Sequence, residues 1–281
     1  MGTLFQSRSG ADPGYYRQKR KAERERGRSM TNAEFEAEAY ERGDSSSLSD
    51  TGTSVFDPVL CELSYAWYSA EGDRVLDPFA GGSVRDIVAE RMGRAYTGIE
   101  LRAEQVEANR AQGNELCGTC PTWIHGDSAE MDGLLDEDGF DLLFTCPPYA
   151  DLEVYSDGPA DISNMGIDGF LEMYEVILRK AVAKLADDRF AVVVIGDARG
   201  KDGFYYNLPG KTVEIMERAG ARYYNEVILV TLAGSLPIRA GRQFAASRKL
   251  GKAHQNVLTF CKGDPKRAVG RLGDVEIPDL K

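Results

Sequence analysis

Short apolar segments alternate with amphipathic helical segments from Phe56 onward, and this alternation restricts the fold more than any other feature of the chain. Apolar residues recur at spacings of three to four over 169–186, which is typical of a helix that packs one face on a core. Another helix is predicted to begin near Ser83, and a third over 212–220 to end at Gly220. Such alternation favours the α/β class, with an open, doubly wound, mostly parallel seven-stranded sheet. The predicted strands are 73–79, 95–101, 122–127, 140–148, 190–197, 224–232 and 256–262.

The domain organisation follows from where this alternation starts and stops. Residues 1–52 precede it and are rich in charges and serines, so they are predicted to be a charged N-terminal extension with some helix. Residues 53–263 form the predicted domain, and residues 264–281 form a C-terminal tail. The 281 residues suffice for one α/β domain of this kind.

The charge distribution sets two basic segments against an acidic remainder. The formal net charge is −11, from 34 basic and 45 acidic residues, which taken alone argues against a polyanionic partner. Residues 1–29 nevertheless hold eight basic and three acidic residues, a local charge of +5 that leaves −16 elsewhere. This arm is either solvated or a nucleic-acid contact.

The second basic segment, residues 234–254, carries five basic residues and no acid. We predict that it is a basic loop that binds the phosphates of a nucleic acid; a solvated exposed loop is the alternative. Its basic residues are Arg239, Arg242, Arg248, Lys249 and Lys252.

Cysteine usage and hydropathy favour a cytoplasmic protein. Five cysteines scattered over a long chain argue against a disulfide framework. Cys117 and Cys120 form a single CxxC pair, for which two reduced thiols in a loop are expected in preference to a metal site. No apolar run is long enough to cross a bilayer, and the first residues lack the pattern of a signal peptide. We therefore expect no metal and no membrane partner.

Three predicted strands end in residues that suit a nucleotide-like ligand. Asp77 opens the turn 77–82, DPFAGG, whose glycines let a ligand approach the backbone beside the N–H groups of a helix start. Glu100 lies 23 residues further on, where an acid suits ribose hydroxyls, and Asp127 is placed to accept from an adenine amino group. Each acid alone would also fit a solvated loop. Ligands bind at the carboxyl ends of parallel strands, so the three are expected to share one site.

The fourth strand end is the segment Thr145-Cys146-Pro147-Pro148-Tyr149. Two prolines directly after a buried strand fix the backbone and remove two N–H donors, which leaves carbonyl oxygens as the polar groups. Acceptors beside the face of an aromatic ring form a pocket for a planar group that carries an NH2. A rigid turn with a packed tyrosine is the alternative interpretation.

Together these motifs resemble those of the S-adenosylmethionine-dependent DNA methyltransferases that modify exocyclic amino groups, giving N6-methyladenine or N4-methylcytosine. DPFAGG is similar to the family's DPFxGxG loop, and CPPY is similar to its (D/N/S/T)PP(Y/F) catalytic motif. The resemblance implies a Rossmann-like class I methyltransferase fold, DNA as partner, and catalytic roles for Cys146, Pro147, Pro148 and Tyr149. It also implies that S-adenosylmethionine is held by Phe56, Asp57, Asp77, Pro78, Phe79, Gly81, Gly82, Glu100 and Asp127.

The sequence departs from the family pattern at two positions. Ser83 stands where the second glycine of the loop is expected, with Gly82 one place early. Cys146 stands where the family has Asp, Asn, Ser or Thr, a side chain that accepts a hydrogen bond from the target NH2 together with the carbonyl at Pro147. In the family, the ring at Tyr149 stacks on a flipped-out base. A neutral thiol is a weak acceptor, so either the Pro147 carbonyl carries most of this role, or Cys146 acts as a thiolate, or the activity is altered.

Several other functions stay open. RNA or guanine amino methylation uses a similar NPPY-type site, and the weak acceptor at Cys146 suggests an inactive, cofactor-binding nucleic-acid module. Covalent pyrimidine methylation also uses a cysteine, but there the proline precedes it, whereas here both prolines follow. Only 69 residues separate Asp77 from Cys146, so a recognition element has to be small or lie in a loop. Residues 161–165 and 203–211 are candidates for further contacts near the pocket.

Overall fold

The computed structural model describes residues 24, 26, 56–117, 121–149, 158, 160–230 and 236–275. The chain divides into two compact units, Met1–Asp57 with Val230–His254 and Pro58–Leu229 with Gln255–Lys281. We call the second the sheet unit. The predicted N-terminal extension lies almost wholly outside the described residues, as do the side chains of the CxxC pair.

The strands are β1 (Arg74–Asp77), β2 (Ala95–Glu100), β3 (Thr122–His125), β4 (Phe140–Thr145), β5 (Leu185–Ile195), β6 (Ala221–Val230) and β7 (His254–Lys262). They form one sheet in the order β3-β2-β1-β4-β5-β7-β6. The first five pair in parallel, and β7 runs antiparallel to β5. The predicted doubly wound, mostly parallel, seven-stranded sheet is confirmed.

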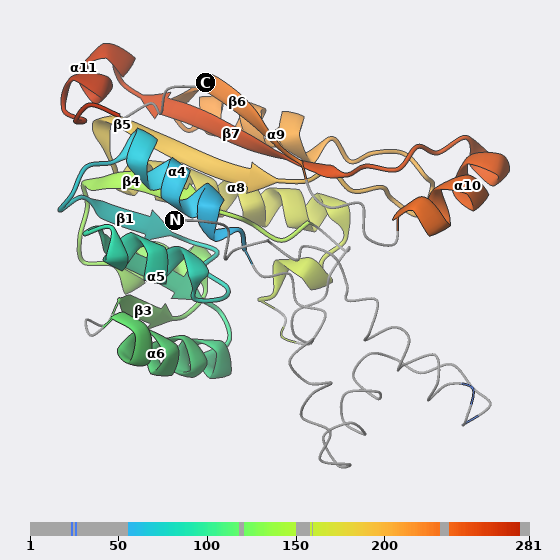
Figure 1. Cartoon of the computed structure of the whole chain (residues 1–281), viewed down its shortest axis with the longest axis horizontal. Coiled ribbons are helices and arrows are strands. Elements are labelled where there is room, and N and C mark those ends of the chain that lie inside the picture. Colours follow the sequence, from blue (N-terminus) through green and yellow to red (C-terminus); the bar gives the residue numbers. More distant parts are fainter. Residues whose placement is uncertain are drawn as a thin grey trace, which may run out of the picture. The chain divides into compact units, whose positions relative to one another are not determined.

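The helices are α4 (Pro58–Tyr68), α5 (Val84–Arg91), α6 (Ala103–Cys117), α7 (Met131–Leu134), α8 (Ile167–Lys184), α9 (Leu208–Arg218), α10 (Leu236–Ser247) and α11 (Pro265–Gly270). Two short 3-10 helices, η1 (Ser128–Glu130) and η3 (Ile162–Asn164), complete the elements. In the sheet unit, α4, α5 and α6 cover one face of the sheet and α8 and α9 cover the other (Figure 1). Gly220, at φ +97°, follows the end of α9, as predicted.

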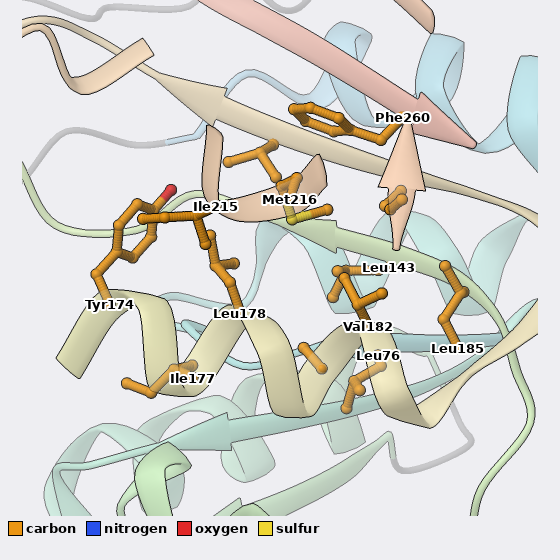
Figure 2. Close-up of a cluster of buried hydrophobic side chains, with 14 of the residues drawn as sticks. Leu76, Leu143, Tyr174, Ile177, Leu178, Val182, Leu185, Ile215, Met216 and Phe260 are labelled. Carbon is orange, nitrogen blue, oxygen red and sulfur yellow. The ribbon is translucent and has the colours of Figure 1, made fainter. Parts of the chain in front are cut away.

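The core between α8 and the sheet fixes the strand ends that carry the site. Leu178 and Val182 of α8 pack with Leu76 of β1 and Leu143 of β4, and all four are fully buried (Figure 2). Each such side chain contributes about 1.5–3 kcal/mol through burial. Because β1 and β4 are adjacent and parallel, this packing holds their carboxyl ends at one edge of the sheet.

The prediction of a basic loop in the C-terminal third was wrong in part. The segment 234–254 was expected to be a basic loop, but Leu236–Ser247 form α10 and β7 already begins at His254. Alanine, arginine and glutamine are good helix formers and outweigh the single Gly241 within this run. The predicted C-terminal tail, residues 264–281, contains α11, which begins where Asp264 accepts a hydrogen bond from the backbone N–H of Lys266 at 2.8 Å.

Candidate active site

The four predicted strand ends meet at one edge of the sheet unit. β3, β2, β1, β4 and β5 are consecutive neighbours in the sheet and run parallel, so their carboxyl ends lie together. The glycine loop, residues 77–82, leaves β1, and the CPPY turn, residues 146–149, leaves β4. The spatial relation that the sequence predicted between these segments is confirmed.

The backbone of the glycine loop is held from both sides at Gly81. Its N–H donates to Glu100 Oε2 at 3.0 Å, and its carbonyl accepts from Asn109 Nδ2 at 2.7 Å. Gln105, one turn earlier on α6, donates to Asn109 Oδ1 at 2.8 Å and so orients that amide. Gly81 has φ +56°, a left-handed conformation that glycine adopts at no steric cost. These bonds and this φ value hold the backbone of the loop at Gly81.

Glu100 is the last residue of β2, and only 11% of its side chain is exposed. Besides Gly81, it accepts from the backbone N–H of Arg102 through Oε1 at 3.0 Å. Burial raises the pKa of Glu100, although the hydrogen bonds from Arg102 and Gly81 act to lower it. Each carboxylate oxygen has a second lone pair, so the side chain can still accept from a ligand hydroxyl.

Asp77 is the last residue of β1 and the first of the glycine loop. It is fully buried, and its Oδ2 accepts from Arg85 Nε at 2.6 Å and from the Tyr96 hydroxyl at 2.8 Å. Its Oδ1 accepts from the Thr145 hydroxyl at 2.6 Å and from the backbone N–H of Phe79 at 3.1 Å. With no exposed surface, Asp77 braces the start of the glycine loop through these bonds, and direct cofactor contact by Asp77 stays a prediction.

Arg85 is a site residue that sequence reasoning missed. It lies in the first turn of α5, and its Nη2 donates to the carbonyls of Phe79 and Ala80 at 2.7 and 2.8 Å, while Nε pairs with Asp77. Burial acts to lower the pKa of Arg85, but Asp77 and its other neighbours raise it well above its ordinary value. A cation at a helix start, where anions are favoured, was the available signal.

The remaining predicted cofactor residues are placed as follows. Asp127 is half-buried and caps η1 by accepting from the backbone N–H of Ala129 at 2.8 Å, and the next residue, Ser128, donates to the Pro78 carbonyl at 2.5 Å. The ring of Phe79 packs against Tyr174, and Gly82 is exposed. The half-buried Phe56 and Asp57 belong to the first unit. Cofactor contact by all these residues stays a prediction.

The CPPY turn is connected to two neighbouring strands. The Tyr149 hydroxyl accepts a hydrogen bond from Gln255 Nε2 of β7 at 2.7 Å and lies 3.5 Å from Cys146 Sγ. Its ring lies over Gly196, the residue after β5, where an added Cβ would come within 3.8 Å of two ring carbons. Cys146 and Tyr149 are half-buried and Pro147 is buried. Neither Gln255 nor Gly196 was predicted, because their contacts arise only from strand order.

A short hairpin follows β5 beside this turn. The backbone N–H of Gly200 donates to the Phe204 carbonyl at 2.9 Å, and the Arg199 guanidinium lies 3.6 Å from the centre of the Tyr205 ring. Arg199 also donates to the Gly203 carbonyl at 3.0 Å. The hairpin, residues 196–207, thus presents the Phe204 side chain to solvent, with 74% of the residue exposed. Residues 203–207 of the predicted contact region 203–211 therefore belong to the hairpin that begins at Gly196, the residue beneath the Tyr149 ring.

The predicted nucleic-acid residues lie on and after α10, in the first unit. Arg248, at φ +57°, is exposed and lies over the Phe244 ring at 5.0 Å. Lys249 and Lys252 are half-buried, and the side chains of Arg239 and Arg242 lie outside the described part of the chain. Nucleic-acid binding by these residues stays a prediction.

The described residues contain neither a metal-binding cluster nor a membrane-spanning helix. No group of three or more histidines, cysteines or acids among them is arranged to hold a metal ion. Within the same residues, every helix is too short or too polar to cross a membrane.

Neither a family model nor a curated protein matches the sequence. Among solved structures, the fold is similar to that of a methyltransferase from Pyrococcus furiosus, with a TM-score of 0.50 and 16% identity over 74% of this chain and 84% of that one. It is also similar to the [4+2]-cyclase SpnF, with a TM-score of 0.51 and 14% identity over 73% and 81% of the two chains. For TrmN from Thermus thermophilus the TM-score is 0.49 and the identity 15% over 74% of this chain, which spans 49% of that protein.

The sheet unit therefore has the Rossmann-like fold of class I methyltransferases, as the sequence predicted. Because a cyclase shares this fold, the fold leaves the reaction open. The reaction has to be argued from the site.

Proposed function

We propose that this protein transfers a methyl group from S-adenosylmethionine to an exocyclic amino nitrogen of a DNA base, either N6 of adenine or N4 of cytosine. The observation that carries the proposal is the buried hydrogen bond, 2.6 Å long, from the Thr145 hydroxyl to Asp77. It joins Asp77, where the glycine loop suited to a nucleoside begins, to the last residue of β4, which directly precedes the CPPY turn suited to a planar amino group. Cofactor and target would therefore meet at one edge of the sheet.

The glycine loop fits S-adenosylmethionine in shape and charge. An added Cβ at Gly82 would meet nothing within 4 Å, so a ligand has room at the backbone. Glu100 offers its remaining lone pairs to the ribose hydroxyls, and Asp127 is the candidate acceptor for the adenine amino group. A ligand without phosphate suits a loop flanked by these acids. When bound, S-adenosylmethionine supplies a methyl group on a positively charged sulfonium.

The CPPY turn has three tasks toward the target base. The Pro147 carbonyl and Cys146 Sγ accept hydrogen bonds from the amino group, which turns the nitrogen lone pair toward the methyl group. The Tyr149 ring, backed by Gly196, offers a flat face on which a flipped-out base can stack. The hydrogen bond from Gln255 to the Tyr149 hydroxyl holds that ring in position.

Two features support a nucleic acid as the partner. The segment from Arg239 to Lys252 has a charge of +5 with no acid, which suits phosphates. The hairpin that leaves β5 beside Tyr149 exposes Phe204 and Tyr205, whose ring lies against the Arg199 guanidinium, and such aromatic groups stack on unpaired bases. Bases next to a flipped-out nucleotide would meet these groups.

The proposal is tested by incubating the full-length protein with methyl-labelled S-adenosylmethionine and separate pools of DNA, RNA and free nucleosides. We expect label in DNA, and digestion to nucleosides to give N6-methyladenine or N4-methylcytosine. Label only in RNA would mean that the substrate is RNA and not DNA. Label on guanine would mean that the target base is neither adenine nor cytosine. If the protein binds the cofactor but labels no nucleic acid, it is a binding module and the proposal is overturned.

The role of Cys146 is tested separately with two substitutions. Cys146→Asp supplies the acceptor that the family uses at this position, so we expect activity within about tenfold of the wild type. Cys146→Ala removes the acceptor and should lose about 1–3 kcal/mol of transition-state stabilisation, or roughly 5- to 150-fold in kcat/KM. A covalent mechanism predicts instead that both variants are inactive, because neither retains a sulfur nucleophile.

A further inference from the structure

The Tyr149 hydroxyl lies between two side chains that were not expected to share a contact. On one side Gln255 Nε2 is 2.7 Å away, and on the other Cys146 Sγ is 3.5 Å away. Gln255 belongs to β7, whereas Cys146 and Tyr149 follow β4, and β5 separates these two strands in the sheet. The contact is therefore a product of the strand order and the bent CPPY turn.

The chemistry of the amide sets the direction of the hydrogen bonds. An amide NH2 can only donate, so the phenolic oxygen accepts from Gln255. A hydroxyl that accepts in this way keeps its own hydrogen, which it can donate to Cys146 Sγ on the other side. Sulfur is a weak acceptor as a thiol and a strong one as a thiolate, so a donor at this position favours the charged form.

We infer that Gln255 is a positioning residue, which turns the Tyr149 hydroxyl into a hydrogen-bond donor to Cys146 Sγ and so gives this sulfur thiolate character. The positions of the three side chains come from the geometry and the direction of the bonds from the chemistry of the amide, and only their use in catalysis rests on the proposed function. It also offers an answer to the departure at Cys146, because a thiolate can accept from an amino group where a thiol does so poorly.

The charged and titratable groups around Cys146 are compatible with this arrangement. Arg85 of α5 interacts electrostatically with Cys146, and the cation favours a thiolate, although Asp77 of β1 offsets part of its charge. Tyr174 of α8 also interacts with Cys146; burial raises the pKa of Tyr174, so this hydroxyl stays neutral. The Tyr149 hydroxyl contacts the Cys146 sulfur at 3.5 Å.

In the proposed reaction this sulfur would receive the proton that the amino group has to lose. The amino nitrogen forms a bond to the methyl carbon of S-adenosylmethionine. The bond between that carbon and the sulfonium breaks, and its electron pair stays on the sulfur of the cofactor. The proton released from nitrogen passes to the Cys146 thiolate, which becomes a thiol. Solvent takes that proton afterwards, so the residue returns to its starting state.

The inference is tested without any methyl acceptor, by following alkylation of the full-length protein with iodoacetamide between pH 5 and 10 and locating the label by peptide mass spectrometry. Only the thiolate reacts, so the midpoint of the Cys146 rate profile reports its ionisation. The midpoint is the readout because hydrogen bonding also lowers the plateau rate. The buried Cys61 and Cys261 serve as internal controls, since they react only if the protein opens.

Two substitutions deprive Cys146 Sγ of the hydrogen bond from the Tyr149 hydroxyl in different ways. Tyr149→Phe removes the donor, and Gln255→Glu replaces the amide by an acceptor that draws the hydroxyl hydrogen away from sulfur. We expect each to raise the Cys146 midpoint by about one pH unit, which is about tenfold less thiolate at a pH below the midpoint. Gln243→Glu, an exposed glutamine on α10, adds the same charge and should leave the midpoint unchanged.

The outcomes separate this inference from the proposed function. Unchanged Cys146 midpoints in both variants, with Cys61 and Cys261 still protected, would overturn the inference even if the wild type methylates DNA. Raised midpoints support it even if no methylation is found. Where methylation is measurable, Gln255→Glu should also move the acidic limb of the pH profile of kcat upward, a shift that a merely structural role would not produce.

Discussion

The glycine loop after β1 and the CPPY turn after β4 lie next to each other but are held in different ways. Arg85, Glu100 and Asn109 bind backbone groups of the loop, and the loop itself begins at the fully buried Asp77. The CPPY turn has no N–H at its two prolines, and its aromatic ring is fixed through a hydroxyl at the end of a half-buried side chain. The glycine loop, the proposed cofactor side, is thus held by buried bonds, whereas the CPPY turn, the proposed target side, presents partly exposed groups. Substitutions at the buried bonds around the glycine loop should therefore lower the free energy of unfolding, whereas substitutions beside the CPPY turn should weaken nucleic-acid binding.

The largest expected effect is on the cofactor side, at the buried ion pair. Asp77→Ala leaves Arg85, Tyr96 and Thr145 without their shared acceptor, so we expect the free energy of unfolding to fall by about 3–5 kcal/mol. Urea denaturation measures this change. Asp187→Ala is the matched control, because that side chain is 84% exposed and 3.9 Å from Lys262, and should cost less than about 1 kcal/mol. Equal losses in free energy of unfolding in the two variants would show that the buried bonds of Asp77 do not stabilise the glycine loop more than an exposed ion pair does.

A second effect on the same side depends on pH. Asp86 follows Arg85 in α5 and is fully buried; its Oδ2 accepts from Trp123 Nε1 at 3.1 Å, and its Oδ1 has no partner among the described residues. Burial raises the pKa of Asp86 to about 7. The unfolded chain ionises this group near pH 4, so its stabilising effect is complete below about pH 4 and is lost as pH rises to about 7.

Asp86→Asn should abolish most of that pH dependence. At pH 8 we expect the variant to exceed the wild type in free energy of unfolding by about 2–4 kcal/mol, and the two to converge near pH 4. Urea denaturation at several pH values measures the difference. Asp136→Asn, in an exposed loop, should follow the wild type throughout. A difference independent of pH would contradict the assignment of the effect to ionisation.

On the target side we expect loss of binding without loss of stability. Phe204→Ala removes the exposed ring of the hairpin, and base stacking on one aromatic ring is worth about 1–3 kcal/mol. The Kd for a fluorescent single-stranded oligonucleotide should rise about 5- to 150-fold, while the Kd for S-adenosylmethionine and the urea midpoint stay the same. Tyr223→Ala, on β6 and 40% exposed, is the control and should bind like the wild type. If both variants bind normally, the hairpin is not a stacking surface.

The smallest expected effect comes from a pair of adjacent glycines. Gly81→Ala forces a side chain into a left-handed conformation at φ +56°, at a cost of about 1–2 kcal/mol, whereas Gly82→Ala meets nothing within 4 Å. We expect the Kd for S-adenosylmethionine, measured by calorimetry, to rise roughly 5- to 30-fold for Gly81→Ala and less for Gly82→Ala. The opposite order would mean that the ligand occupies the space beside Gly82.

Much of the fold was predictable because it depends on local patterns. Apolar runs and their spacing located all seven strands, and Gly220 marked the end of a helix. The helix α10 was missed because its glycine and basic residues were read as a loop, although its other residues favour a helix. α4 and α6 were not predicted either, since their apolar residues are interrupted by polar ones.

The site was predictable in position but not in its connections. Glu100 and Tyr149 lie where strand ends indicated, at the edge shared by the glycine loop and the CPPY turn. Arg85 and Gln255 gave no such signal, because neither belongs to a motif and each acts through a contact across the sheet. Asp77 did belong to a motif, but its burial decided that it braces the loop.

The sequence by itself determined the order of strands and helices, the glycine loop and the CPPY turn, because each rests on residues that are neighbours in the chain. Only the tertiary structure decided which side chains meet: Asp77 with Arg85, Tyr96 and Thr145, and Tyr149 with Gln255. Those partners are separated in sequence by 8 to 106 residues. Parallel pairing brings distant strand ends to one edge, and burial then requires every polar group there to find a partner.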